Sequence, residues 1–122
     1  MDQELRSLSD FEREVVNILL IADFPGRDVI RKCIEISRVK TIDEHGSLKF
    51  YASECARAET SRNVPVEGRA IDIDGVPIYV LLHTPYGIPS EMEVYKADGS
   101  AILDLNVLKG MEVYSLPPES PR

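Results

Sequence analysis

Residues 64–105 read VPVEGRAIDIDGVPIYVLLHTPYGIPSEMEVYKADGSAILDL, and this stretch decides the fold. Apolar and polar residues alternate along it, and two pairs, Asp74-Gly75 and Asp98-Gly99, each separate two apolar runs. Asp-Gly tolerates the positive φ angles of a two-residue type I′ hairpin turn. The stretch therefore predicts an antiparallel meander with two tight turns and a longer loop, 84–90, centred on Gly87.

Tight turns fix which residues lie opposite each other, and opposed residues share one face of a sheet. The predicted pairs include Ile71 with Ile78, Tyr79 with Tyr95, and Val94 with Leu103. The predicted core face carries Ile71, Ile73, Val76, Ile78, Val80, Leu82, Met92, Val94, Leu103 and Leu105. The second face carries Ala70, Tyr79, Leu81, His83, Glu91, Glu93, Tyr95 and Ile102. We expect Arg69 and Lys96 at the rim of the core face, where their charges reach water.

The residues that precede this stretch predict two helices. Ser9 and Glu12 form a capping-box pattern, so a first helix begins near Asp10. It ends before Pro25, because the residue ahead of a proline is disfavoured in the helical region. Apolar residues at helical spacing predict a second helix over 27–37. Neither helix is long enough to be stable alone in water, so both are expected to dock on the core face.

Two further strands complete the expected sheet. Short β-rich runs at 39–42 and 48–52 are separated by five residues and predict a hairpin. Residues 53–63 are rich in small and charged residues and are expected to form an exposed connection. The predicted fold is α+β, with an N-terminal αα-hairpin packed on one face of a curved antiparallel sheet of about five strands.

Length and charge limit the class of protein. A chain of 122 residues with 43% hydrophobic residues is expected to form one domain, 1–116, followed by a disordered Pro-rich tail, 117–122. The net charge of −7 disfavours nucleic acid and anionic lipid as partners, because both require clustered Lys and Arg.

The start of the chain and its cysteines suggest a compartment. The first ten residues, MDQELRSLSD, lack the basic and apolar regions of a signal peptide. The longest apolar run, Ile18 to Ala22, is too short to cross a bilayer. We therefore expect a cytoplasmic protein, in which Cys33 and Cys55 remain thiols.

Five segments carry a resemblance to a known family. They are FPGR at 24–27, GSLKF at 46–50, VPVE at 64–67, DIDGVPIYVLLH at 72–83 and EMEVYKADGSAI at 91–102. Through them nearly the whole chain resembles a family of small bacterial proteins described only as a domain of unknown function. The resemblance implies a helical hairpin followed by an antiparallel sheet, and it implies no activity. The chain departs from the family pattern at Thr84-Pro85-Tyr86.

The candidate site lies on the second face of the predicted sheet. Its residues are Tyr79, Leu81, His83, Glu91, Glu93 and Tyr95. His83 opposite Glu91 would be half of a general-base arrangement, but no motif presents a nucleophile to it. His83 and the two glutamates supply at most a partial set of metal ligands. We therefore expect no catalytic residue, no metal and no cofactor.

Two hypotheses about function remain open. The first is a cytoplasmic protein-interaction module, including an immunity or antitoxin type, whose second sheet face binds a partner protein or a second copy of the chain. The alternative is a small-molecule-binding protein or hydrolase with a pocket between the sheet and the 84–90 loop. The shape of the second face separates the two hypotheses.

Overall fold

The computed structural model describes residues 5–60 and 62–117. Two helices precede the sheet: α1 (Asp10–Leu19) and α2 (Arg27–Glu35). The strands are β1 (Arg38–Thr41), β2 (Leu48–Tyr51), β3 (Val66–Ile71), β4 (Pro77–His83), β5 (Glu91–Lys96) and β6 (Glu112–Ser115). Two short 3-10 helices, η1 (Pro85–Gly87) and η2 (Leu105–Gly110), lie before and after β5.

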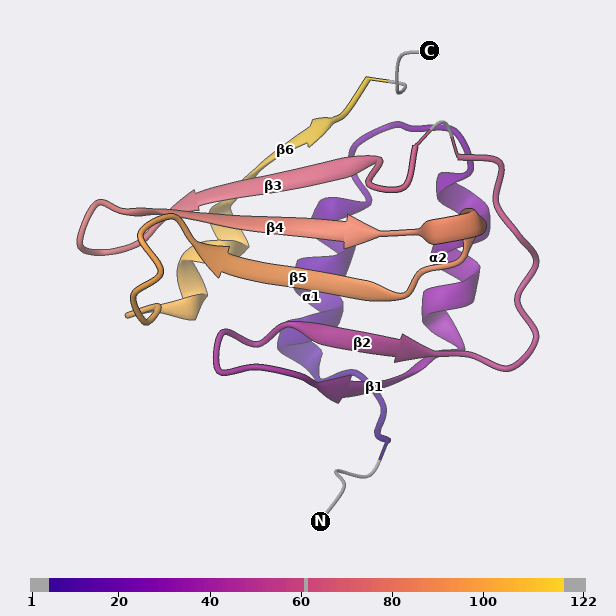
Figure 1. Ribbon diagram of the computed structural model, residues 1–122, viewed down its shortest axis with the longest axis horizontal. Coiled ribbons are helices and arrows are strands. Elements are labelled where there is room, and N and C mark those ends of the chain that lie inside the picture. Colours follow the sequence, from indigo (N-terminus) through magenta and orange to yellow (C-terminus); the bar gives the residue numbers. More distant parts are fainter. Residues whose placement is uncertain (1–4, 61, 118–122) are drawn as a thin grey trace.

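All neighbouring strands are antiparallel, in the order β1-β2-β5-β4-β3-β6. The helices α1 and α2 lie behind the sheet as Figure 1 shows it, and leave the facing side open. The predicted α+β class and the packing of the helices on one face are confirmed, with a sheet of six strands.

The start of each helix follows from local sequence. Ser9 caps α1 by accepting a hydrogen bond from the main-chain N–H of Glu12, whose carboxylate accepts one from the N–H of Ser9. The predicted capping box is therefore confirmed. Gly26 precedes α2 at φ 87°, in the left-handed region that favours glycine.

The core lies between the helices and one face of the sheet. The helices contribute the buried side chains Val15, Val16, Leu19, Leu20, Ile30 and Ile34, and the central strands contribute Val66, Ile78, Val80, Leu82, Met92 and Val94. Burial alternates strictly along β4, with every second residue buried. This alternation divides the sheet into a core face and an open face.

The β4–β5 pairing follows the predicted register. Val80 lies opposite Val94, and Tyr79 lies opposite Tyr95. The predicted hairpin of β1 and β2 is also confirmed, with Thr41 opposite Leu48.

The predicted register of β3 is wrong by one residue. Asp72 donates its main-chain N–H to the carbonyl of Val76, so the turn has three loop residues, 73–75, where two were predicted. A shift of one residue exchanges the two faces of a strand. Ile71 and Ile73 are therefore exposed, at 59% and 69%, whereas Ala70 lies in the core.

The predicted strand after Asp98-Gly99 is also wrong. The tight turn forms, with the N–H of Gly99 donated to the carbonyl of Lys96, but the chain then leaves the sheet and enters η2. Strand β2 takes the free edge of β5. Ile102, predicted on the second face, packs against the core.

A buried ionic cluster at this end of the sheet explains why the chain departs. The ammonium of Lys96 donates to Asp72 at 2.9 Å, to Asp74 at 2.6 Å and to the carbonyl of Ala101 at 3.1 Å. The side chains of Lys96 and Asp72 are fully buried, so the prediction that Lys96 reaches water is wrong. The cluster ties the segment after β5 to the turn between β3 and β4.

The long connection between β2 and β3 runs along the end of the sheet, beside α2 and η1 (Figure 1). A disulfide joins Cys33 of α2 to Cys55 of the connection, so the prediction that both remain thiols is wrong. The N–H of Ala58 donates to the carbonyl of Gly87, which fixes the connection to η1. The described residues of the connection therefore do not cover the open face.

The sequence Met-Glu-Val-Tyr occurs at 92–95 and again at 111–114, and the second occurrence lies mostly in β6, which pairs with β3. Residues 118–122 of the predicted tail lie outside the described residues. Among the described helices, none has the length and apolar character that a membrane crossing requires.

Candidate functional site

The six predicted site residues lie together on the open face. Strand β4 supplies Tyr79, Leu81 and His83, and β5 supplies Glu91, Glu93 and Tyr95 directly opposite them. They share this face because they alternate with the buried residues of the same strands. No described helix or loop lies over them (Figure 1).

An aromatic group occupies one end of the site. The rings of Tyr79 and Tyr95 stack with their centroids 5.2 Å apart and an interplanar angle of 29°. The guanidinium of Arg69, on β3, lies 5.7 Å from the Tyr79 ring centroid and 5.1 Å from that of Tyr114 on β6. Arg69 therefore lies between two tyrosine rings, an arrangement stabilised by cation–π attraction.

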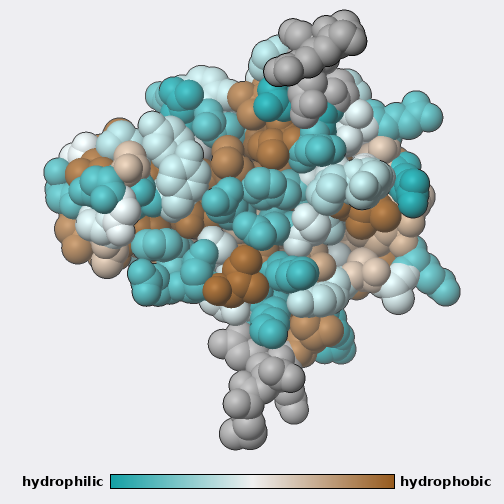
Figure 2. Space-filling model, viewed as in Figure 1, coloured by the Kyte–Doolittle hydropathy of each residue, from teal (hydrophilic) through white to brown (hydrophobic). Residues whose placement is uncertain are grey.

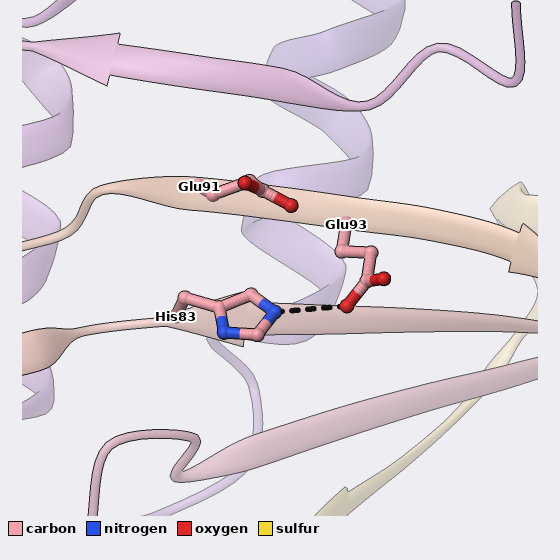
Figure 3. A group of neighbouring side chains, drawn as sticks. All are labelled: His83, Glu91 and Glu93. Atoms are coloured by element: carbon pink, nitrogen blue, oxygen red, sulfur yellow. Dashed lines mark hydrogen bonds and ion pairs between the residues drawn. The ribbon is translucent and has the colours of Figure 1, made fainter. Parts of the chain in front are cut away.

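An ionisable group occupies the other end (Figure 3). His83 lies opposite Glu91 in the register, as predicted, but its Nε2 forms a 2.9 Å hydrogen bond with Oε1 of the diagonal Glu93. The carboxylate of Glu91 forms no hydrogen bond or ion pair with any of the described residues. Potential ligand atoms of these three residues all lie within 4.8 Å of one another.

The hydroxyl groups near His83 are used by the main chain. Ser90 Oγ donates to the main-chain carbonyl of His83 at 3.5 Å, and Thr84 Oγ1 donates to the carbonyl of Asn63 at 3.3 Å. General-base catalysis requires a hydroxyl or other proton donor within reach of the imidazole. The Ser90 and Thr84 hydroxyls therefore give no support to a nucleophile activated by His83.

The charges of the site are predominantly acidic. Burial raises the pKa of the Tyr95 phenol, and the nearby carboxylates Glu67 and Glu93 raise it further. The pKa of Tyr114 is raised chiefly because its hydroxyl donates to the carboxylate of Glu112. Across β3 to β6 the open face carries four glutamates, Glu67, Glu91, Glu93 and Glu112, and Arg69, whereas the neighbouring β1 and β2 add Arg38, Lys40 and Lys49 to the same face.

The cavity lined by the 84–90 loop is separate from these ionisable groups. It has a volume of about 600 Å³ and lies where β1 begins and β2 ends, lined by Leu5, Ile36, Arg38, Phe50, Tyr51, Ala52, Ser53, Ile88, Pro89 and Ser90. A second hollow, of about 430 Å³, lies beside Arg69 and Tyr79 on β3 and β4. In Figure 2 the open face is mostly hydrophilic, with hydrophobic patches separated by polar side chains.

Sequence reasoning missed the contribution of β3 and β6 to the site. The two-residue turn predicted at Asp74-Gly75 assigns Arg69 to the core face, and the sequence does not place Tyr114 beside β3. A three-residue loop at Asp72–Val76 would have placed Arg69 beside Tyr79. The pattern Glu67-Gly-Arg69, with charges at alternate positions, is the signal that favours this register.

Comparison with known proteins yields one match. The family model described as "Domain of unknown function (DUF6984)" matches residues 5–106. Searches of curated proteins and of solved structures return no significant match.

Proposed function

Because the chain belongs to this domain-of-unknown-function family, whose description names no activity, we propose a function from the geometry: it is a protein-interaction module that binds a basic partner protein through the open face. The observation that carries the proposal is the uncovered site on β4 and β5. Tyrosine and arginine are the side chains that dominate binding energy at protein interfaces. Here Tyr79, Tyr95 and Arg69 lie together at one end of the site.

The charge of the face around β4 supports a partner of opposite sign. Glu67 and Glu93 lie opposite the half-buried Leu81 on the two neighbouring strands, and the whole chain has a net charge of −7. A surface of this kind attracts a basic protein and accelerates its association. Small acidic proteins of the immunity or antitoxin type would act in this way on a basic toxin.

The polar character of the face disfavours a permanent homodimer. Obligate interfaces are larger and more apolar than the rest of a protein surface. The open face is mostly hydrophilic, and a second copy would bring the same net charge of −7 to it. We therefore infer a separable partner, with self-association as the competing outcome.

A paired substitution tests the proposal. The change Tyr79→Glu with Tyr95→Glu should leave the protein folded and abolish capture of any partner that the wild type captures from its native host. Tyr86→Glu is the matched control, because Tyr86 is 81% exposed and lies in η1, outside the open face. Capture should also weaken as salt is raised, and should fail with Glu91→Lys plus Glu93→Lys.

Three results would overturn the proposal. The first is a captured partner that both tyrosine variants retain. The second is loss of folding in the double variant, measured by circular dichroism, which would show that the face is part of the core. The third is a dimer of the wild type in light scattering together with a monomer of the double variant. This result would show that the open face binds a second copy of the chain.

The compartment is a further part of the proposal. We propose a bacterial cytoplasmic setting for this chain. The disulfide between Cys33 and Cys55 tests it directly, because such bonds are rare in cytosolic proteins. Alkylation of free thiols in intact cells separates the outcomes: labelling of both cysteines supports the cytoplasm, and a fully bonded pair, as in the structure, contradicts it.

A further inference from the structure

We propose that His83, Glu91 and Glu93 form a binding site for a divalent transition-metal ion such as Zn²⁺ or Mn²⁺. The inference goes beyond the proposed protein-binding function and does not depend on it. It rests on the arrangement of three side chains from β4 and β5 on the open face (Figure 3).

The chemistry of the three groups suits such an ion. One imidazole nitrogen and two carboxylate oxygens are ligands that Zn²⁺ and Mn²⁺ accept, at distances of about 2.0–2.2 Å. Two ligands at that distance in tetrahedral geometry lie about 3.4 Å apart. His83 Nε2 and Glu93 Oε1 are 2.9 Å apart, and all three ligand atoms lie within 4.8 Å. Side-chain rotations that move the ligand atoms by about an ångström therefore suffice to bring all three to coordination distance of one ion.

The backbone beneath the three groups is fixed. His83 and Glu91 lie directly opposite each other, and the β4–β5 pairing continues for six residue pairs. The loop that joins these strands is held by the hydrogen bond from Ala58 to Gly87. A site on paired strands is positioned more rigidly than a site on a free loop.

A separate observation is that Glu91 lacks a counter-charge. Lys49 of β2 is its direct cross-strand neighbour, but the Lys49 ammonium lies 5.8 Å from the Tyr51 ring centroid and forms no ion pair with Glu91 among the described residues. With a neutral imidazole, the three groups together carry two negative charges. A divalent cation neutralises this charge.

The open side of the site leaves room for water. The side chains of His83 and Glu93 are 33% and 38% exposed, so solvent reaches the position between them. Three protein ligands and an open position are the pattern of metal sites that bind a water molecule or a further ligand, as distinct from closed structural sites with four protein ligands.

Titration of the metal-stripped, tag-free full chain with ZnCl₂ tests the proposal. Isothermal titration calorimetry should show one Zn²⁺ per chain with a Kd in the micromolar range or tighter. His83→Ala and Glu91→Gln should each weaken binding at least tenfold, and Mg²⁺ should bind far more weakly than Zn²⁺. The protein is kept oxidised, because free thiols at Cys33 and Cys55 would add zinc ligands.

Matched controls separate this site from adventitious binding. His45 is the other histidine and lies in the turn between β1 and β2, and Glu67 is a carboxylate of the same face outside the set. His45→Ala and Glu67→Gln should leave the Kd within about twofold, and Co²⁺ should give a visible absorption band that His83→Ala removes. The proposal is overturned if the wild type does not bind Zn²⁺, if folded His83→Ala binds as tightly, or if His45→Ala abolishes binding.

Discussion

Two ionic clusters use the same β3–β5 region of the sheet and differ in almost every physical respect. In the sealed cluster, Lys96 donates three hydrogen bonds, and Asp72 accepts from Lys96 and from three main-chain N–H groups. The open cluster consists of His83, Glu91 and Glu93. Among the described residues, the His83 imidazole is hydrogen-bonded to the carboxylate of Glu93 alone, and the carboxylate of Glu91 has no partner. A buried charge is tolerated only when it is paired and hydrogen-bonded, whereas a half-exposed charge can remain available. The comparison supports a folding role for the sealed cluster and the proposed binding role for the open one.

Removing Lys96 should have the largest effect. Lys96→Ala leaves the buried carboxylate of Asp72 without its counter-ion, and breaking one partner of a buried pair is strongly destabilising. We expect the melting temperature to fall by more than about 10 °C. Lys49→Ala, at an exposed lysine of β2, is the matched control and should shift it by less than about 3 °C. Equal shifts would show that burial does not distinguish the two lysines.

Acid should weaken the sealed cluster next. Burial alone would raise the pKa of Asp72, but hydrogen bonds from the N–H of Leu103, the Lys96 ammonium and the N–H groups of Ile73 and Asp104 outweigh it and hold the pKa well below the usual range. A folded-state pKa below the unfolded value of 3.8 gives stability that is complete above this value and is lost as the pH falls below it.

Thermal melts from pH 5 to pH 2 test the predicted loss of stability in acid. The wild type should lose stability below about pH 4, whereas Asp72→Asn should start less stable and lose less over the same interval. The pKa values of Glu12, Asp43 and Asp98 are also lowered, so the variant should keep part of the slope. Parallel curves for the two proteins would contradict the assignment of acid sensitivity to Asp72.

The sealed cluster also shows what the sequence could not predict about the fold. The central β4–β5 register was predictable, because Gly87 centres the loop and apolar residues alternate on both strands. The turn at Asp74-Gly75 was misjudged because two-residue and three-residue loops share the same Asp-Gly pattern. The carboxylate of Asp72 accepts hydrogen bonds from the main-chain N–H groups of Leu103 and Asp104, which holds this segment away from the sheet. No local sequence pattern predicts a hydrogen bond between residues 31 positions apart.

The sequence predicts which residues lie on the open face, but it does not predict which of their side chains contact each other. The alternation on β4 and β5 placed all six site residues on one face, which the structure confirms for each of them. Which carboxylate His83 binds depends on side-chain rotamers, and so does the turning of Lys49 toward Tyr51. The disulfide was missed because the spacing of Cys33 and Cys55 says nothing about their proximity in the fold.

Removing Glu93 should have a small effect. Glu93→Ala deletes the carboxylate that is hydrogen-bonded to the His83 imidazole, and such half-exposed pairs contribute roughly 0.2–1 kcal/mol to the free energy of unfolding. Urea unfolding should show a loss within this range, well below that of Lys96→Ala. Glu54→Ala, at an exposed carboxylate of the β2–β3 connection, controls for the general effect of removing a negative charge. A loss as large as that of Lys96→Ala would mean that the open cluster is also structural.

Neutralising Glu91 should have the smallest effect on the metal-free protein. Its carboxylate has no partner among the described residues and lies near that of Glu93, so Glu91→Gln removes repulsion and no attraction. The free energy of unfolding should stay the same or rise by a few tenths of a kcal/mol.

The same variant gives the sharpest contrast when metal is present. A ligand that binds only the folded state stabilises it by RT ln(1 + [L]/Kd), about 2.7 kcal/mol for 100 µM Zn²⁺ at a Kd of about 1 µM. The wild type should gain stability of this order, whereas Glu91→Gln should gain at most about half as much, because it lacks one of three ligands and binds Zn²⁺ at least tenfold more weakly. Lys96→Ala, if it remains folded, should keep the zinc-dependent gain, because it leaves the open cluster intact. An equal gain in the wild type and in Glu91→Gln would place the metal elsewhere and remove the functional distinction between the two clusters.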